Sequence, residues 1–145
     1  VLSVNTQAQQ YEVNLYQDLL LLTSIDHVGN TPPTLDAVLK GKIMWKYFHL
    51  SGGYERAELA QPYNRATIAI GGHYNWKMLE VSQDVNYGLI VRPFSTTWSY
   101  GADSELAIII KHRFKIIGLL QVTQRTEWGD LIRWSTFIGI GYKFK

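Results

Sequence analysis

The sequence predicts an all-β fold, an up-and-down barrel of eight antiparallel strands that crosses a membrane. Apolar and polar residues alternate with period two along most of the chain, which is typical of strands with one apolar and one polar face. Charged residues make up only 18% of the chain, while Trp and Tyr number 5 and 9. No apolar run approaches the roughly 20 residues of a transmembrane helix. Strands rather than helices would therefore cross the bilayer.

The composition limits the domain organisation and the class of ligand. A chain of 145 residues is long enough for one domain. Residues 1–9 run from apolar into small and polar residues, and we expect a signal-peptide remnant or a disordered N-terminus there, followed by the barrel. The net charge of +2 comes without a run of Lys or Arg, which argues against nucleic acid as a partner. Cysteine is absent, so thiolate metal sites are excluded, and we expect neither a metal nor a cofactor.

Eight alternating segments, separated by turn residues, are the predicted strands. Short connections follow the second, fourth and sixth segments, whereas longer ones follow the first and the fifth. In bacterial membrane barrels the short turns face the periplasm, and an even number of strands places both termini at that rim. The segments are Gln10–Ser24, Leu35–Met44, Tyr47–Ala60, Asn64–Asn75, Met78–Pro93, Glu105–His112, Ile116–Thr126 and Leu131–Lys145.

Alternation by itself does not say which face meets lipid, because a soluble lipocalin-like barrel would turn its apolar face inward. The last segment favours the membrane: one face is apolar from Ile132 to Phe144, and the other carries Arg133 and Lys143. Bulky aromatic residues also gather near both ends of the strands, as in the girdles of membrane barrels. The predicted interface aromatics are Trp45, Tyr74, Trp76, Trp128, Trp134, Tyr142 and Phe144.

The polar face carries both acids and bases and would line the interior. Eight strands enclose a lumen just wide enough to be filled by side chains. An unpaired charge there is costly, so we expect ion pairs and a closed interior rather than an open pore. The predicted lumen network is Glu12, Asp18, Lys40, Lys42, His49, Glu55, Arg65, His73, Glu80, Asp84, Arg92, Lys111 and Arg133.

Tight turns predict the register of neighbouring strands. A two-residue turn after the second segment would set Lys42 opposite His49. Short turns after the fourth and third segments would set His73 opposite Glu80 and Ser51 opposite His73. Ser51, His73 and Glu80 would then line up across three strands, in the order of hydroxyl, imidazole and carboxylate that a hydrolase uses.

Two other interpretations of these residues stay open. The one that we favour places His73 and Glu80 in the lumen network, with Ser51 filling space between them. A metal site from His49, His73 and Glu80 would have suitable ligand types but a generic spacing.

The connection from Phe94 to Ser104 is predicted as an external loop. Its Trp98, Tyr100 and Asp103 are candidates for contact with lipopolysaccharide, a glycan or a partner protein. Anchoring of the two aromatic rings at the membrane interface is the alternative interpretation.

The last strand, with its penultimate Phe144, resembles the C-terminal signature of bacterial outer-membrane proteins. Over nearly the whole chain the pattern is similar to that of the small OmpA- and OmpX-like barrels, and the ending IGYKFK resembles Bacteroidota-type outer-membrane proteins. The resemblance implies an integral protein in the outer membrane of a Gram-negative bacterium, with a structural, adhesive or accessory-subunit role. Its implied partners are outer-membrane lipids and a protein of an envelope complex.

Three alternative functions remain from the sequence. Ser51, His73 and Glu80 are similar in residue type to the Ser-His-Glu group of eight-stranded lipid A deacylases, which implies an envelope lipid-modifying hydrolase. The local motif of that family is not found around His73, and its active site faces lipid rather than the lumen. A narrow channel is the second alternative, and a soluble lipid-carrying barrel is the third.

Overall fold

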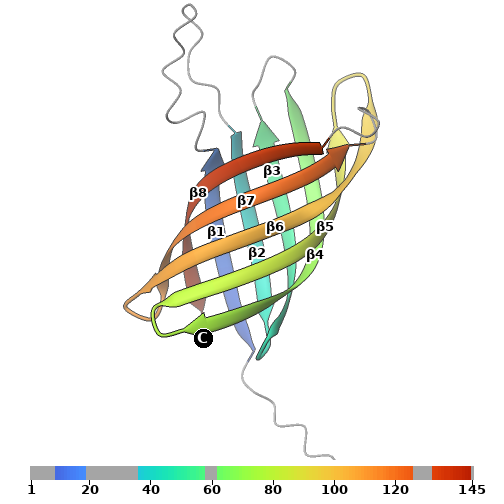
Figure 1. Ribbon diagram of the computed structural model, residues 1–145. Coiled ribbons are helices and arrows are strands. Elements are labelled where there is room, and N and C mark those ends of the chain that lie inside the picture. The colour runs from blue at the N-terminus through green and yellow to red at the C-terminus, as the bar shows by residue number, and fades with distance from the viewer. Residues whose placement is uncertain (1–8, 19–35, 58–61, 126–131, 145) are drawn as a thin grey trace, which may run out of the picture.

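The structure is a computed structural model that describes residues 9–18, 36–57, 62–125 and 132–144. Strands make up most of this part of the chain (Figure 1). Residues 1–8, residues 19–24 of the first predicted strand and Trp128 lie outside the described residues. No helix in the described part is long and apolar enough to span a membrane. The strands are β1 (Gln10–Asp18), β2 (Asp36–Met44), β3 (Phe48–Ala57), β4 (Tyr63–Trp76), β5 (Leu79–Val91), β6 (Thr96–Ile110), β7 (Phe114–Arg125) and β8 (Ile132–Phe144).

The eight predicted strands are all present, and they form one closed barrel. Each strand pairs antiparallel with its neighbours in the chain, and β8 returns to β1, where Tyr11 lies opposite Phe144 and Asp18 opposite Phe137. Closure gives every strand a hydrogen-bonded neighbour on both sides, which is what a sheet needs in order to cross a bilayer. The predicted fold class is therefore confirmed.

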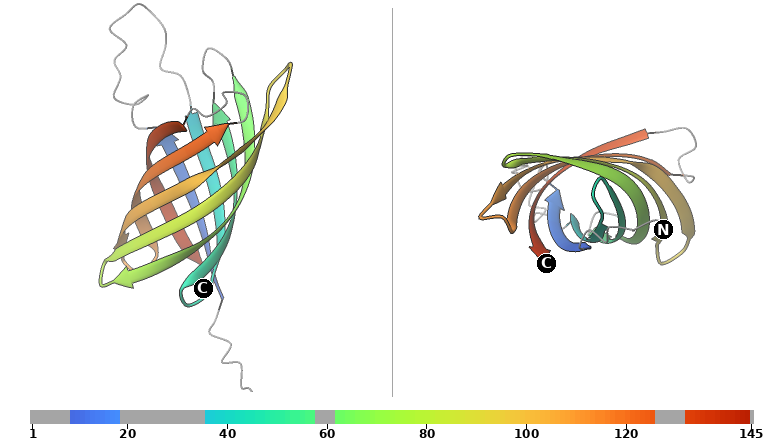
Figure 2. Two further views of the ribbon diagram at one scale, coloured as in Figure 1. Left: turned by 45° about the vertical axis from the view of Figure 1, so that its right-hand side comes forward. Right: turned by 90° about the horizontal axis from the view of Figure 1, so that it is seen from below.

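The turns between β2 and β3, β4 and β5, and β6 and β7 lie at the rim where β1 begins and β8 ends (Figures 1 and 2). We call it the short-turn rim. Trp45 donates its backbone N–H to the Phe48 carbonyl over 2.8 Å in the first of these turns. In the other two, Lys77, Lys111 and His112 have positive φ angles of 55°, 51° and 64°, the left-handed conformation that tight hairpin turns use. The opposite end is the long-loop rim.

The register differs from the predicted one at all three hairpins that the sequence addressed. The displacement is an even number of residues in each case, because the centre of each connection lies one or two residues away from its assumed position. Since successive side chains alternate between faces, an even displacement leaves every side chain on its predicted face. The observed pairs are Lys42 with Ser51, His73 with Ser82 and Ser51 with Ala69.

β6 begins at Thr96, whereas the sequence predicted a strand from Glu105. The predicted external loop is wrong: the turn is short and closed by a 2.9 Å hydrogen bond from the Arg92 N–H to the Ser95 carbonyl. The β5–β6 hairpin reaches past the neighbouring strands at the long-loop rim (Figure 2, left, gold). Ser, Thr, Gly and Asp are common in turns, and their density between residues 95 and 104 concealed a regular alternation.

The two faces of the barrel have the polarity of a membrane protein. Outward apolar side chains such as Ile70 and Ile140 are each 65% exposed, whereas the inward Lys40 is 3% exposed. A soluble barrel would show the reverse arrangement. Apolar residues inside are confined to two clusters, Tyr16, Val38, Ala107, Ile117, Leu119 and Phe137, and Ala57, Tyr63 and Ile90.

Candidate functional site

The centre of the lumen is a cluster of buried charges around Lys40. Its ammonium nitrogen lies 3.1 Å from Asp84, 2.9 Å from Asp103 and 3.0 Å from Glu105. These residues come from β2, β5 and β6, so the contacts join different walls of the barrel. Lys42, two residues further along the inward face of β2, forms an ion pair with Glu105. The cluster thus holds two ammonium groups against three carboxylates.

A pair of histidines extends this cluster toward the short-turn rim. His49 Nε2 is hydrogen-bonded to the Asp84 carboxylate. Its Nδ1 lies 3.2 Å from Nδ1 of His73. A carboxylate only accepts, so His49 donates through Nε2, and one of the two Nδ1 atoms must carry the proton between the rings.

A second group of ion pairs lies near the short-turn rim. Lys115 on β7 contacts Glu12 on β1 at 2.5 Å, and it also forms an ion pair with Glu80 on β5. Lys143 on β8 contacts the other oxygen of Glu80 at 2.5 Å. Asn14 donates to Glu12 over 2.6 Å. Two lysines and two carboxylates balance one another in this group.

A third group lies toward the long-loop rim and is centred on Arg65. Its guanidinium donates to Asn86 and to Ser99, both over 2.8 Å. It lies 3.5 Å from the Glu55 carboxylate, which also accepts a 2.7 Å hydrogen bond from the Tyr63 hydroxyl. Asn86 in turn donates to Asp103 over 2.8 Å, so the third group is linked to the central cluster.

The structure places most of the predicted lumen residues inside the barrel. His73 and Arg92 are only partly buried, and Arg92 lies just beyond the end of β5. Lys111 is wrong as a lumen residue, because it lies exposed in the β6–β7 turn. The side chain of Arg133 lies outside the described residues. The predicted residues that are buried are Glu12, Asp18, Lys40, Lys42, His49, Glu55, Arg65, Glu80 and Asp84.

The sequence interpretation missed three charged residues of this network. Asp103 and Glu105 were placed in or next to a predicted loop, and Lys115 was placed in a turn. All three are buried and paired. Extending the period-two alternation back through Gly101 and Ser99 would have found the two acids, because these positions share their face.

The predicted catalytic triple is not assembled. Ser51 lies opposite Ala69 and Lys42, and its buried hydroxyl has no hydrogen-bond partner among the described residues. His73 contacts His49, while Glu80 is held by Lys115 and Lys143. The register that brought Ser51, His73 and Glu80 together is therefore wrong. The described residues also contain no group of three or more His, Cys, Asp or Glu placed to hold a metal ion.

Aromatic residues mark both rims of the outer surface. Trp45, Tyr74 and Trp76 are exposed near the short-turn rim, and Trp134 is exposed near the long-loop rim. Phe114, Tyr142 and Phe144 form edge-to-face ring contacts, with centroids 5.0 and 4.9 Å apart. On β5 and β6, Tyr87 stacks on Trp98 at 5.2 Å. Trp98 and Tyr100, predicted in a loop, thus belong to the outward face of the wall.

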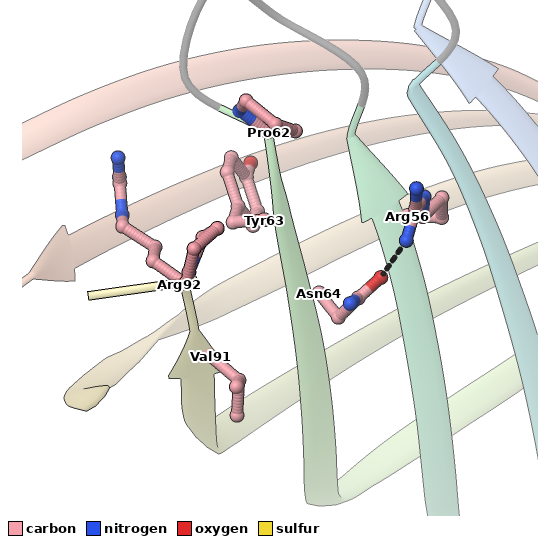
Figure 3. A pocket seen from close by; sticks show the side chains of 7 residues that line it. Arg56, Pro62, Tyr63, Asn64, Val91 and Arg92 are labelled. Atoms are coloured by element: carbon pink, nitrogen blue, oxygen red, sulfur yellow. Dashed lines mark hydrogen bonds between the residues drawn. The ribbon is translucent and has the colours of Figure 1, made fainter. Parts of the chain in front are cut away.

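A pocket of about 290 Å³ opens at the long-loop rim, between the start of β4 and the end of β5 (Figure 3). Its two cationic side chains come from different strand ends and stand on either side of Pro62 and Tyr63 in this view. Arg56 donates to Asn64 over 3.0 Å. The Arg92 guanidinium lies 5.4 Å from the centre of the Tyr63 ring, in a cation–π contact. Positive charge and an apolar floor are combined here at the outer rim.

No family model and no curated protein matches the sequence, but solved structures match the fold. OprH of P. aeruginosa in micelles has a TM-score of 0.67 at 10% identity, over 94% of this chain and 100% of that chain. Ail of Yersinia pestis in a nanodisc has a TM-score of 0.63 at 13% identity, over 94% and 98%. The N-terminal barrel domain of Pseudomonas aeruginosa OprF has a TM-score of 0.57 at 13% identity, over 93% and 97%. The chain therefore has the fold of the small eight-stranded outer-membrane β-barrels.

Proposed function

We propose that the chain is an integral protein of the Gram-negative outer membrane with a closed lumen and a non-enzymatic role, as a structural, adhesive or accessory component of the envelope. The lumen network carries this proposal. Its three groups, around Lys115, Lys40 and Arg65, follow one another from the short-turn rim toward the long-loop rim. The exposed apolar belt and the outer-membrane neighbours support the location, with outer-membrane lipids as the surrounding partners.

The bridges that close the lumen run between walls that are not adjacent. Lys40 on β2 reaches Asp84 on β5 and Asp103 on β6, and Lys115 on β7 reaches Glu80 on β5. A permeating ion would have to separate these pairs. Breaking one buried pair leaves an uncompensated charge that costs about 3–5 kcal/mol. Two such groups in series, with the Arg65 group between them and the long-loop rim, favour a plug over the narrow channel that the sequence left as an alternative.

Planar-bilayer recording tests the closed lumen. We expect no discrete conductance from the folded protein, whose insertion is checked by the gel-mobility change of barrels on heating. A triple variant with Lys40, Asp84 and Asp103 each replaced by Ala removes the central cluster. Its recordings serve as the comparison that shows whether the method can detect conductance through an opened lumen. Steady single-channel steps from the unmodified protein would contradict a closed lumen.

The hydrolase alternative receives no support from the register. It would still predict that His73→Ala changes the envelope lipids. We expect the mass spectra of lipids from cells producing the His73→Ala protein and the unmodified protein to be the same. A difference in acyl-chain number between the two would revive the alternative.

Adhesion to an anionic polymer is a second candidate, and the rim pocket between Arg56 and Arg92 favours it. Both guanidinium groups lie at the end of the barrel that faces outward if the short turns face the periplasm. Ail, which shares the fold, has been solved in complex with the heparin analogue sucrose octasulfate at a TM-score of 0.53 and 12% identity to this chain. Sulfate and phosphate groups are the ligands that arginine recognises by charge and bidentate hydrogen bonds.

Binding to immobilised heparin in nanodiscs tests this candidate. We expect Arg56→Gln with Arg92→Gln to weaken retention and to lower its dependence on salt. Lys46→Gln and Lys77→Gln, at the opposite rim, form the matched control for charge. Equal retention of both double variants would show that the pocket is not the binding site.

A further inference from the structure

A hydrogen-bonded polar pair lies on the outward face of β5 and β6, within the apolar belt. Gln83 and Ser104 are exposed cross-strand partners, and the Ser104 hydroxyl donates to Gln83 Oε1 over 2.6 Å. The outward pairs next to them are apolar: Val81 with Leu106 on one side and Val85 with Ala102 on the other. The polar pair therefore lies at the depth of the hydrocarbon, away from the headgroups.

The amide of Gln83 has hydrogen-bonding capacity that the barrel does not use. Among the described residues, Ser104 is its hydrogen-bond partner, through Oε1, and none accepts from Nε2. An amide carries two N–H donors, and its oxygen has a second lone pair. Acyl chains offer no acceptor, and an unsatisfied polar group in hydrocarbon costs several kcal/mol. A partner for Nε2 at this depth has to come from protein.

A groove lies beside the Gln83–Ser104 pair on the outer surface and could receive a side chain of a docking partner. It has a volume of about 460 Å³ and lies over Gly118 of β7, where the wall has no side chain. A methyl group on Gly118 would meet no atom closer than the Leu106 carbonyl oxygen at 3.9 Å, so the space is not needed for packing within the barrel. The outward residues that line the groove are Val81, Ser104, Leu106, Leu120 and Thr136.

We propose that the face around Gln83, on β5, β6 and β7, docks in the membrane against the same face of a second copy of this chain. A primary amide is self-complementary, because it donates through nitrogen and accepts through oxygen. Two copies related by a two-fold axis beside Gln83 can exchange reciprocal N–H to Oε1 bonds, as an isologous interface requires. Each groove over Gly118 then receives an apolar side chain from the other copy. This interface goes beyond the proposed function, which a monomer could also perform.

Site-directed cross-linking tests the orientation of the dimer. The chain contains no cysteine, so single-cysteine variants can be made without removing native thiols. Val85→Cys lies next to Gln83 on the outward face of β5, and Val13→Cys lies on the outward face of β1. In phosphatidylcholine vesicles with an oxidant, we expect a disulfide-linked dimer from Val85→Cys and little from Val13→Cys. Equal cross-linking at the two positions, or none at either, overturns the proposal.

Sedimentation equilibrium in detergent tests whether the Gln83 amide stabilises the dimer. We expect Gln83→Leu to raise the dimer dissociation constant about tenfold, the effect of losing one or two intramembrane hydrogen bonds. Gln124→Leu is the matched control: Gln124 accepts from Tyr100 on the outward face of β6 and β7, away from the groove, and its loss should leave the constant unchanged. Heat-dependent gel mobility checks that both variants fold. A protein that is monomeric at every protein-to-detergent ratio, or a Gln83→Leu variant that dimerises equally well, overturns the proposal.

Discussion

Lys115 on β7 and Glu12 on β1 form an ion pair of 2.5 Å across β8, the strand that separates theirs. The same ammonium group is bound to Glu80 on β5, so one side chain ties three parts of the wall together. All three residues are about 1% exposed. Removing the lysine would leave Glu80 with Lys143 alone and Glu12 without its cationic partner, in a space that water hardly reaches.

We therefore expect Lys115→Met to lower the free energy of unfolding by about 3–5 kcal/mol, the usual effect of breaking a buried ion pair. Lys111→Met is the matched control, because Lys111 is exposed in the adjacent turn, and its change should stay within about 0.5 kcal/mol. Urea unfolding in lipid vesicles, followed by tryptophan fluorescence, measures both values. Similar losses for the two variants would contradict the assignment of Lys115 to the lumen.

Gly139 is expected to resist enlargement. A methyl group there would lie 2.6 Å from Tyr16 Cδ1 and 2.7 Å from the Leu15 carbonyl oxygen. Gly139→Ala should therefore cost about 1–3 kcal/mol of stability through overpacking. At Gly41 nothing lies within 4 Å of such a methyl group, so Gly41→Ala should be neutral or stabilising by about 0.5–1 kcal/mol. If the two substitutions have the same effect in urea unfolding, the inward packing around Tyr16 is not as described.

The outward face of β4 distinguishes a membrane barrel from a soluble one. Ile70 is 65% exposed near the middle of the strand, so Ile70→Arg should cost about 2–4 kcal/mol if that surface meets hydrocarbon. In a soluble barrel the same change would be harmless. Phe94→Arg, in the exposed β5–β6 turn, is the control and should cost little. Both variants are compared by folding yield into vesicles and by urea unfolding, and a tolerated Ile70→Arg would contradict burial of this face in lipid.

Because β6 begins at Thr96, Trp98 lies in a strand of the barrel wall and not in an external loop. Its ring is stacked on Tyr87 on the outward face, so acyl chains rather than bulk water should surround it. In a variant in which Trp98 is the sole tryptophan, brominated lipids should quench the fluorescence strongly and aqueous iodide weakly. Strong quenching by iodide would instead agree with the external loop that the sequence suggested.

Much of the architecture could be predicted from the sequence because it depends on period-two alternation and on turn residues. These local features located eight strands and assigned faces correctly even where the register was displaced by two or four residues. Turn position was the weak point: the β3–β4 pairing sets Ser51 opposite Ala69, and the β4–β5 pairing sets His73 opposite Ser82. These two displacements separated Ser51, His73 and Glu80.

The candidate site depended on relationships that no local pattern contains. The sequence showed that acids and bases share one face, and this made ion pairing in a narrow lumen the expected outcome. It did not show that Lys40 meets Asp84, Asp103 and Glu105, because these contacts cross the barrel between strands 44 to 65 residues apart in the chain. The tilt and stagger of the strands decide which inward side chains of one strand lie at the same height as those of a strand across the lumen. Both tilt and stagger follow from closure of the whole sheet.

The amino-acid sequence by itself determined the all-β membrane barrel, the polarity of its faces and the charged character of its interior, because side-chain chemistry and period are local properties. The tertiary structure alone decided which charges pair, that Lys111 lies outside and Lys115 inside, and that Gln83 and Ser104 meet on the lipid face. The physical reason is that register in a closed barrel is set jointly by all eight strand pairs. A contact across the lumen exists only after the last strand has returned to the first.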